Sequence, residues 1–331
     1  MTDKPHINNN LRPDTIDEYV GQESAVKTLK IFLSGVKKRG IASEHILFYG
    51  PPGIGKTTLS YIIARELEGD LKVTTGATLT KTGDLAAILT NLKDKDVLFI
   101  DEIHRMPKAV EEMLYPVMEE YALDIIIGKG PSARTMRLPI PRITIVGATT
   151  KLAMLSAPLR DRFGLVLRLD YYNESQMKNI IKRSAQLIGI GVTDDAASLI
   201  AKRSRRTPRI ANRMLKRAHD VAQSQGVSVI DDKLLDKLFH LLEIDSVGLI
   251  DIDIQYLRAI AILFENQPVG VDTLSSSLSE DKRTIEEFIE PYLLRIGFIK
   301  KTSRGRIVTS AGLAHLALQN NSTLDKQDSL I

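Results

Sequence analysis

Short apolar runs alternate with helix-like periodicity through the first half of the chain. A continuous apolar run of four to six residues is typical of a strand buried on both faces of a parallel sheet. We therefore expect an α/β fold built on a parallel sheet. Strands are expected at residues 45–49, 71–75, 97–100, 142–147 and 165–169, and helices at 21–36, 58–67, 83–92 and 109–121.

From Ser175 the pattern predicts helices only. The first four, at 175–188, 194–203, 208–224 and 231–242, indicate a small helical bundle. After a linker at 248–253, helices at 254–264, 271–278 and 281–294 precede a hairpin at 297–309. Three helices and a hairpin are typical of a winged helix. The expected domains are 1–170, 171–247 and 248–318, followed by a polar tail at 319–331.

Composition narrows the class of protein. With 331 residues the chain is longer than a single hydrophobic core usually supports, so more than one domain is expected. Its content of 43% hydrophobic and 26% charged residues is ordinary for a globular protein. The sequence shows no apolar run of membrane-spanning length and no secretory pattern, so we expect a cytoplasmic location. Zero cysteines exclude disulfides, thiolate catalysis and cysteine-bound zinc. The net charge is only +4, but basic residues concentrate at 202–217 and 282–306, which favours an anionic partner.

One glycine-rich stretch predicts a phosphate site. Residues 50–57 place Gly50, Gly53 and Gly55 before Lys56 and Thr57, matching the phosphate-binding loop pattern. Glycines let backbone N–H groups wrap a phosphate chain, the lysine reaches the β and γ phosphates, and the hydroxyl meets Mg²⁺. Because a predicted strand enters the stretch and a predicted helix leaves it, an ordinary surface turn is disfavoured.

Two acids end the third predicted strand. Asp101 and Glu102 follow four apolar residues, at the sheet edge where open α/β sheets bind ligands. Asp101 is expected to meet Mg²⁺, and Glu102 to orient or deprotonate the attacking water. The alternative is a solvated acidic pair. His104 is interpreted as a structural residue or as one that supports the site indirectly.

Other candidates follow in the chain. Thr149 and Thr150 end a strand, where a hydroxyl can touch the γ phosphate or can simply cap a helix. Arg160 and Arg162 lie in a turn; arginine suits transition-state phosphoryl charge, although the turn alone indicates only surface ion pairs. Arg209, in the first turn of a helix, could face a nucleotide between two domains.

An expected hairpin at 123–138 carries three consecutive isoleucines, Ile125, Ile126 and Ile127. Since adjacent strand residues point to opposite faces, one packing surface cannot bury all three. They either enter the core or present an apolar patch to a partner protein.

The order of these features resembles the AAA+ ATPases. With the hairpin and the winged helix, the chain closely resembles the RuvB family, the bacterial Holliday-junction branch-migration motors, from about Leu11 to about Leu318. The resemblance implies a hexameric ring that encircles double-stranded DNA and pulls it by ATP hydrolysis. It also implies RuvA, which holds the four-way junction, and the resolvase RuvC.

The resemblance assigns roles to individual residues. It implies phosphate and Mg²⁺ binding by Lys56, Thr57 and Thr58, with Asp101 and Glu102 as the acidic motif, and γ-phosphate sensing by Thr149 or Thr150. Further implied roles are an arginine finger at Arg162, a lid sensor at Arg209, and adenine-side or lid positions at Leu11, Arg12 and Tyr172. The hairpin is implied to dock RuvA, which favours the patch at Ile125–Ile127, and DNA contact is implied for Arg283, Lys301, Arg304 and Arg306.

Two departures from the family pattern stand out. Arg206 replaces a common glycine before the lid motif Thr207-Pro208-Arg209, and Lys301 replaces a common arginine.

Two other functions fit parts of the sequence. A clamp-loader-like or remodelling ATPase is disfavoured by the winged helix and the hairpin. A DNA-binding regulator that uses ATP only as a ligand would need neither Glu102 nor Arg162. A winged helix also binds proteins in some cases, so the wing alone leaves a non-DNA role open.

Overall fold

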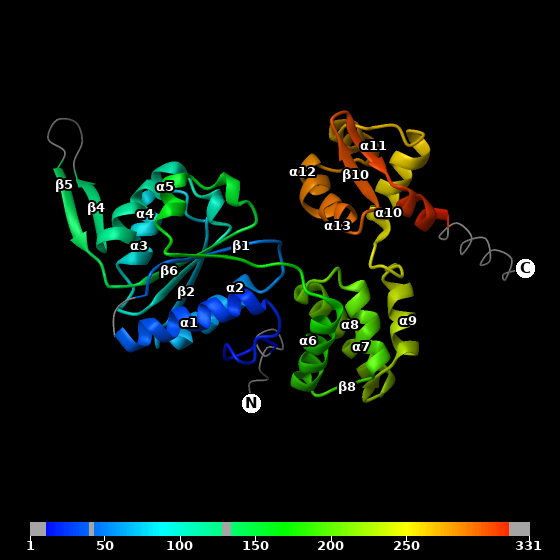
Figure 1. The fold of residues 1–331 in the computed structure, drawn as a ribbon, viewed down its shortest axis with the longest axis horizontal. Helices are drawn as coiled ribbons and strands as arrows, with labels where there is room; N and C mark the ends of the chain where they lie inside the picture. The colour runs from blue at the N-terminus through cyan, green and yellow to red at the C-terminus, as the bar shows by residue number, and fades with distance from the viewer. Residues whose placement is uncertain (1–10, 40–42, 128–133, 318–331) are drawn as a thin grey trace, which may run out of the picture. The chain divides into compact units, whose positions relative to one another are not determined.

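The computed structural model describes residues 11–39, 43–127 and 134–317 (Figure 1). The chain divides into two compact units, residues 1–219 and residues 220–331. The first contains the parallel sheet and most of the helical bundle that follows it. The second contains the end of the bundle and the C-terminal helices with their hairpin.

A five-stranded parallel sheet forms the centre of the first unit. Its strands lie in the order β2-β3-β6-β1-β7, and each neighbouring pair is parallel. This order brings the carboxyl ends of β1, β3 and β6 side by side at one edge. The α/β prediction is confirmed. The bounds are β1 Ile46–Tyr49, β2 Leu71–Thr75, β3 Val97–Asp101, β6 Thr144–Thr149 and β7 Leu165–Arg168.

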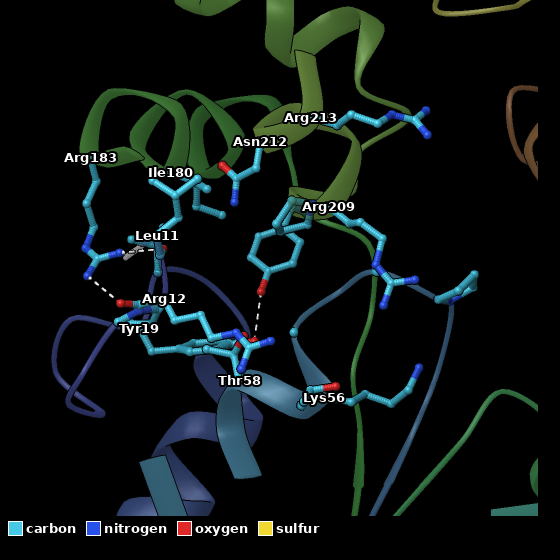
Figure 2. A pocket seen from close by; sticks show the side chains of 18 of the residues that line it. Leu11, Arg12, Tyr19, Lys56, Thr58, Ile180, Arg183, Arg209, Asn212 and Arg213 are labelled. Atoms are coloured by element: carbon cyan, nitrogen blue, oxygen red, sulfur yellow. Dashed lines mark hydrogen bonds between the residues drawn. The ribbon is translucent and has the colours of Figure 1, made fainter. Parts of the chain in front are cut away.

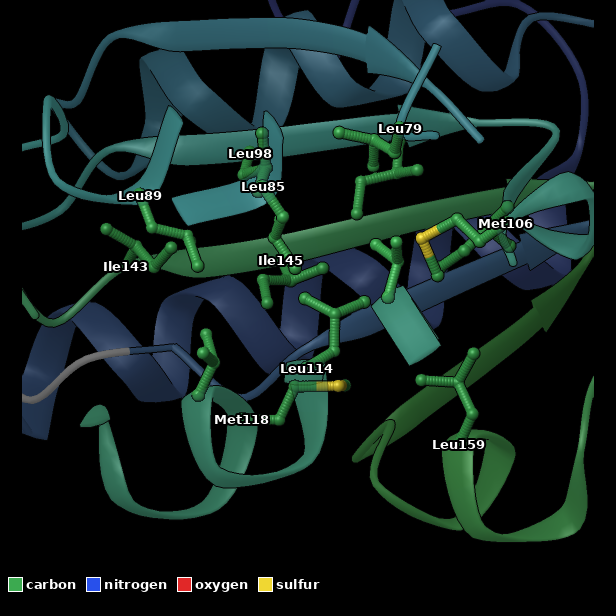
Figure 3. Close-up of a cluster of buried hydrophobic side chains, with 14 of the residues drawn as sticks. Leu79, Leu85, Leu89, Leu98, Met106, Leu114, Met118, Ile143, Ile145 and Leu159 are labelled. Carbon is green, nitrogen blue, oxygen red and sulfur yellow. The ribbon is translucent and has the colours of Figure 1, made fainter. Parts of the chain in front are cut away.

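Helices cover the sheet and explain the unbroken apolar runs. Leu98 of β3 and Ile145 of β6 belong to one core cluster with Leu114 of the helix α4 (Figure 3). The four apolar residues of β3 have no solvent exposure because elements pack on both sides. The helices of this layer are α1 Glu23–Arg39, α2 Lys56–Glu66, α3 Thr82–Leu89, α4 Lys108–Glu120 and α5 Ala157–Asp161, with short 3₁₀ turns at Ile103–Arg105 and Leu152–Met154.

The predicted hairpin is present and projects from the sheet as a separate arm (Figure 1). It pairs β4, Ala122–Ile127, with β5, Arg134–Pro139, and Ile125 lies opposite Met136. Leu123 is buried in the core cluster, so the base of the arm is fixed on the domain.

After the sheet, the first unit continues with helices whose first turns are capped by side chains. Asn173 accepts a hydrogen bond from Gln176 N at the start of α6, and Thr193 accepts one from Ala196 N at the start of α7. The prediction of helices only was wrong at two short strands, β8 Gly191–Val192 and β9 Val229–Ile230. Two residues are too few to show strand alternation. The helices are α6 Glu174–Ile188, α7 Asp194–Arg203 and α8 Pro208–Gln225, which runs into the second unit.

The second unit packs its helices around Tyr256, Leu274 and Leu293, all in one buried cluster. A hairpin of β10 and β11 follows the last helix, as predicted for a winged helix. Within the described residues, no helix is long and apolar enough to cross a membrane. The elements are α9 Asp232–Leu241, α10 Asp251–Arg258, a π-helical turn at Ala259–Leu263, α11 Val271–Leu278, α12 Lys282–Thr284, a second π-helical turn at Ile285–Ile289, α13 Glu290–Arg295, β10 Ile299–Thr302 and β11 Gly305–Val308.

Candidate nucleotide-binding site

The loop after β1 has a backbone that only glycine adopts without strain. Gly50, Gly53 and Gly55 have φ values of 144°, 77° and 105°. A Cβ at Gly50 would lie 2.1 Å from the carbonyl oxygen of Leu169, and one at Gly55 would lie 2.3 Å from the hydroxyl of Tyr19. The loop therefore packs tightly on its surroundings, and α2 begins directly after it at Lys56.

Lys56 folds back over this loop. Its Nζ donates to the carbonyl oxygens of Gly50, at 2.8 Å, and Pro51, at 2.7 Å. Burial lowers the pKa of Lys56 to about 8, and the nearby carboxylates of Asp101 and Glu102 limit that fall. The ammonium group is thus held at the loop, where a phosphate would offer it a stronger partner.

The two acids at the end of β3 have different surroundings. Asp101 Oδ1 accepts the backbone N–H of Glu102 at 3.0 Å, and Glu102 has a left-handed backbone with φ 48°. Thr150 Oγ1 donates to Glu102 Oε2 at 3.3 Å. Thr149 is fully buried, and its hydroxyl lies 2.9 Å from His104 Nδ1. The two threonines therefore have separate environments.

A pocket of about 650 Å³ lies beside these groups (Figure 2). Its volume is within the range of small-molecule sites. Lys56 and Arg209 lie on one side of the view, and Arg183, Leu11 and Arg12 lie on the other. The predicted site residues that line it are Leu11, Arg12, Gly53, Gly55, Lys56, Thr57, Thr58, Asp101, Glu102, Tyr172 and Arg209.

Tyr19 and Tyr172 form one part of the pocket. The sequence predicted Tyr172 as a site residue but not Tyr19. The hydroxyls of Tyr19 and Tyr172 lie 3.0 Å apart, and each donates to the carbonyl oxygen of Ile54, at 3.2 and 3.0 Å. Burial raises the pKa of both phenols. The tyrosines therefore stay neutral and fix the middle of the phosphate loop. Tyr19 belongs to no motif, and only its position before the first helix marks it.

The helical bundle contributes arginines to the same pocket. The backbone N–H of Arg209 donates to the carbonyl oxygen of Gly53 at 3.3 Å, which seats the start of α8 on the phosphate loop. Arg183 of α6 donates to the carbonyl oxygen of Leu11, at 3.2 Å, and to Glu18, at 2.9 Å. Arg183, Asn212 and Arg213 also line the pocket and were not predicted. Arg183 stands in a helix without a local motif, and Asn212 and Arg213 follow the lid motif without belonging to it.

Three family models match consecutive parts of the chain. They are the RuvB P-loop domain at residues 11–169, the RuvB AAA lid domain at 172–245 and the RuvB C-terminal winged helix domain at 246–317. The chain belongs to the RuvB family. It is thus an AAA+ P-loop ATPase of the kind that drives branch migration at Holliday junctions.

Relatives agree over nearly the whole length. The Holliday junction branch migration complex subunit RuvB of Fusobacterium nucleatum subsp. nucleatum is 50% identical over 315 residues, 95% of each chain. The solved structure of the Thermotoga maritima RuvB branch migration motor is 45% identical, covers 93% of this chain and 98% of its own, and superposes with a TM-score of 0.83. A mutant of the same protein gives 46% and 0.84 over the same shares.

Four residues predicted for the nucleotide site are not among the described residues that line the pocket. They are Gly50 at the start of the loop, Thr149 and Thr150 at the end of β6, and Arg162. Arg162, at the end of α5, is ion-paired with Glu119 at 3.0 Å.

The hairpin residues are only partly described. Ile125 is half-buried and packs against the core cluster. Its position therefore supports burial in the core as much as an apolar patch for a partner protein. The side chains of Ile126 and Ile127 lie outside the described residues. Met136, opposite Ile125, is 44% exposed and gives the arm an apolar side chain at its surface.

The basic residues of the wing differ in their surroundings. Glu290, with no solvent exposure, binds Lys301 Nζ at 2.6 Å and Arg306 Nε at 2.7 Å. Burial alone would raise the pKa of Glu290, but the bonds from Arg306 and Lys301 outweigh it and lower the pKa. Arg283 pairs with Glu287 at 2.9 Å, whereas Arg304 at the hairpin turn is exposed.

Arg206, which stands where the family commonly has glycine, has a strained backbone. Arg206 has φ 56°, a left-handed conformation that glycine adopts freely and arginine does not. Its carbonyl oxygen accepts the N–H of Tyr172 at 3.2 Å, which holds this turn against the pocket.

Proposed function

We propose that this chain forms a homohexameric ring around duplex DNA, hydrolyses ATP with Mg²⁺ and moves four-way junctions together with RuvA and RuvC. The observation that carries the proposal is the meeting of Lys56, Asp101 and Glu102 at one pocket of an AAA+ core. Family membership supports the motor activity and the partners, and the geometry of the pocket supports the ion and the roles of its residues.

The donor set suits a magnesium nucleotide. Thr57 offers a hydroxyl and Asp101 a carboxylate at the same pocket, and Mg²⁺ prefers hard oxygen ligands completed by phosphate and water. We assign Mg²⁺ to these two residues, where it would neutralise phosphate charge. Lys56 binds the β and γ phosphates after leaving the two loop carbonyls.

Hydrolysis needs a positioned water and stabilisation of phosphoryl charge. Glu102 is the carboxylate available to orient the water and accept its proton. Arg209, seated on the phosphate loop through its backbone, places a cation near the phosphates. Leu11, Arg12 and Tyr172 line the part of the pocket assigned to the base.

The position of Arg162 supports the proposed ring. An arginine that completes a phosphoryl-transfer site can come from another subunit. Because Arg162 does not line its own pocket among the described residues, we assign it to the neighbour's nucleotide. The active unit is therefore an assembly, and a single chain would hydrolyse ATP slowly.

DNA and partner contacts are assigned to the remaining parts. We assign contact with the DNA phosphate backbone to the basic wing, where Arg304 is exposed, so binding should be non-specific in sequence and weaken as salt rises. We assign the binding of RuvA to the β4–β5 arm, where Met136 is exposed. We expect the resolvase RuvC to act in the same assembled complex.

ATP-dependent dissociation of a synthetic four-way junction tests the proposal. The purified full chain is assayed with and without a RuvA-type protein, beside Lys56→Ala. We expect junction movement that requires ATP and Lys56 and increases with the partner. ATP turnover with no junction movement, even with the partner present, would instead favour a clamp-loader-like or remodelling ATPase.

A further inference from the structure

The carboxylate of Glu102 is held from two sides. Its Oε2 accepts the hydroxyl of Thr150 at 3.3 Å and lies 3.3 Å from Nε2 of His104. Both contacts reach the same oxygen. Glu102, the residue proposed to activate water, is thus oriented by two neighbours, Thr150 and His104.

His104 is an internal residue. Its side chain is 3% exposed, and its ring bridges Glu102 through Nε2 and Thr149 through Nδ1, at 2.9 Å. The 3₁₀ turn Ile103–Arg105, which carries His104, begins directly after the left-handed backbone of Glu102. A bridging histidine of this kind fixes the orientation of the group it contacts.

The contacts favour a proton on Nε2 of His104. Nε2 lies 3.3 Å from Glu102 Oε2, and a carboxylate can only accept. Thr149 Oγ1 accepts the backbone N–H of Lys151 at 2.9 Å and has its own proton to give to Nδ1. We therefore assign a ring proton to Nε2, facing Glu102.

Exposure separates the two threonines. Thr149 is fully buried and its hydroxyl is engaged inside the domain. Thr150 is half-buried, and its hydroxyl proton is directed at Glu102. The two hydroxyls therefore reach Glu102 by different routes, Thr150 directly and Thr149 through His104.

We propose that His104 is a positioning residue for ATP hydrolysis, which holds Glu102 and is itself anchored by Thr149. His104 keeps the carboxylate aimed at the water that attacks ATP. The inference rests on the role proposed above for Glu102.

Matched variants of the full-length chain test the inference. His104→Ala should lower kcat by about 10- to 100-fold with little change in KM, a part of the 10²–10⁴ that a general base contributes. His104→Gln, which keeps an N–H donor, should recover part of the loss. Thr149→Val should resemble His104→Ala.

A measurement without turnover reads the arrangement directly. In the nucleotide-free chain labelled with ¹⁵N at histidine, the His104 signal, assigned by its loss in His104→Gln, should show a proton on Nε2 and a bare Nδ1. Thr149→Val should change this signal more than Thr150→Val. A bare Nε2 would overturn the inference, because His104 would then have no proton to give Glu102, and this result does not depend on the stability of His104→Ala.

The kinetic outcomes are distinguishable from failure of the proposed site. If Glu102→Gln is inactive while His104→Ala and Thr149→Val turn over at the unmodified rate, the positioning role is wrong and the role of Glu102 stands. If Glu102→Gln itself hydrolyses ATP normally, the proposed site is wrong, and the inference fails with it.

Discussion

The guanidinium carbon of Arg162 lies 4.3 Å from the ring centroid of Tyr115. Its Nη1 donates to the carbonyl oxygen of Pro158 at 2.7 Å, and its Nη2 pairs with Glu119 at 3.0 Å. The arginine therefore rests against α4 of its own subunit. To reach a neighbour's nucleotide it must exchange these contacts for phosphate.

Arg162→Ala should bind ATP and fail to hydrolyse it. Because Arg162 lies outside its own pocket, nucleotide affinity should change little, while kcat should fall by about 10³ or more, as for other arginine fingers. Nucleotide binding and steady-state turnover are measured on the same preparation. Mixing it with Lys56→Ala subunits should restore part of the activity, since one interface then joins an intact pocket to an intact arginine. Mixed rings that form and stay inactive would contradict the shared site.

The wing should show a division between supporting and contacting cations. Arg306 is 13% exposed and binds Glu290 and Glu286, so Arg306→Ala should leave the buried Glu290 short of a partner and cost about 3 kcal/mol of unfolding free energy. Arg304→Ala should leave stability unchanged and lower the salt slope of DNA binding by about 1. Chemical denaturation and DNA binding at several salt concentrations separate the two. Equal losses of salt slope without loss of stability would show that both residues contact phosphate.

The motif residues were predictable because local sequence fixes their neighbours. Lys56 follows the glycines, and Asp101 and Glu102 end a buried strand, so the sheet edge brings them together. Arg183 and Tyr19 were not predictable, since long-range packing brings them to the pocket from helices and turns without a motif. The same limit applies to Glu290. Its stretch marked the family resemblance, but only the fold shows that it lies beneath Lys301 and Arg306.

Stability should fall in mild acid because of His45. Its Nδ1 accepts the N–H of Ile145 at 2.9 Å and its Nε2 lies 3.0 Å from the carbonyl oxygen of Met118. Burial lowers the pKa of His45 from 6.5 to about 4. The unfolded chain therefore binds this proton first, so the contribution is complete above pH 6.5 and is lost as the pH falls towards 4. The loss amounts to about 3 kcal/mol.

Denaturation of the protein and of His45→Gln at several pH values measures this contribution. The difference between the two free energies of unfolding should change with pH only in that window. An unchanged difference from pH 7 to pH 4 would show that His45 titrates alike in both states.

Arg206→Gly should stabilise the protein. The change removes a left-handed arginine, at φ 56°, and replaces it with the residue that the family commonly has. The expected gain is about 1 kcal/mol, because relief of 1–2 kcal/mol of backbone strain is partly offset by the entropy of glycine in the unfolded chain. Lys202→Gly, inside the right-handed helix α7, is the matched control and should cost about 1 kcal/mol. Thermal unfolding that moves both variants in the same direction would contradict the strain.

The close packing at Gly50 has a mechanical consequence. Its N–H donates to the carbonyl oxygen of Thr149 at 3.1 Å, and its α-carbon faces the carbonyl oxygen of Leu169 so closely that no side chain fits between them. The ends of β6 and β7 are therefore in direct contact with the start of the phosphate loop. β7 leads to Tyr172 and the helical bundle, and β6 leads to Thr150. We therefore expect Gly50 to couple a displacement of the loop by phosphate to the catalytic edge and to the bundle.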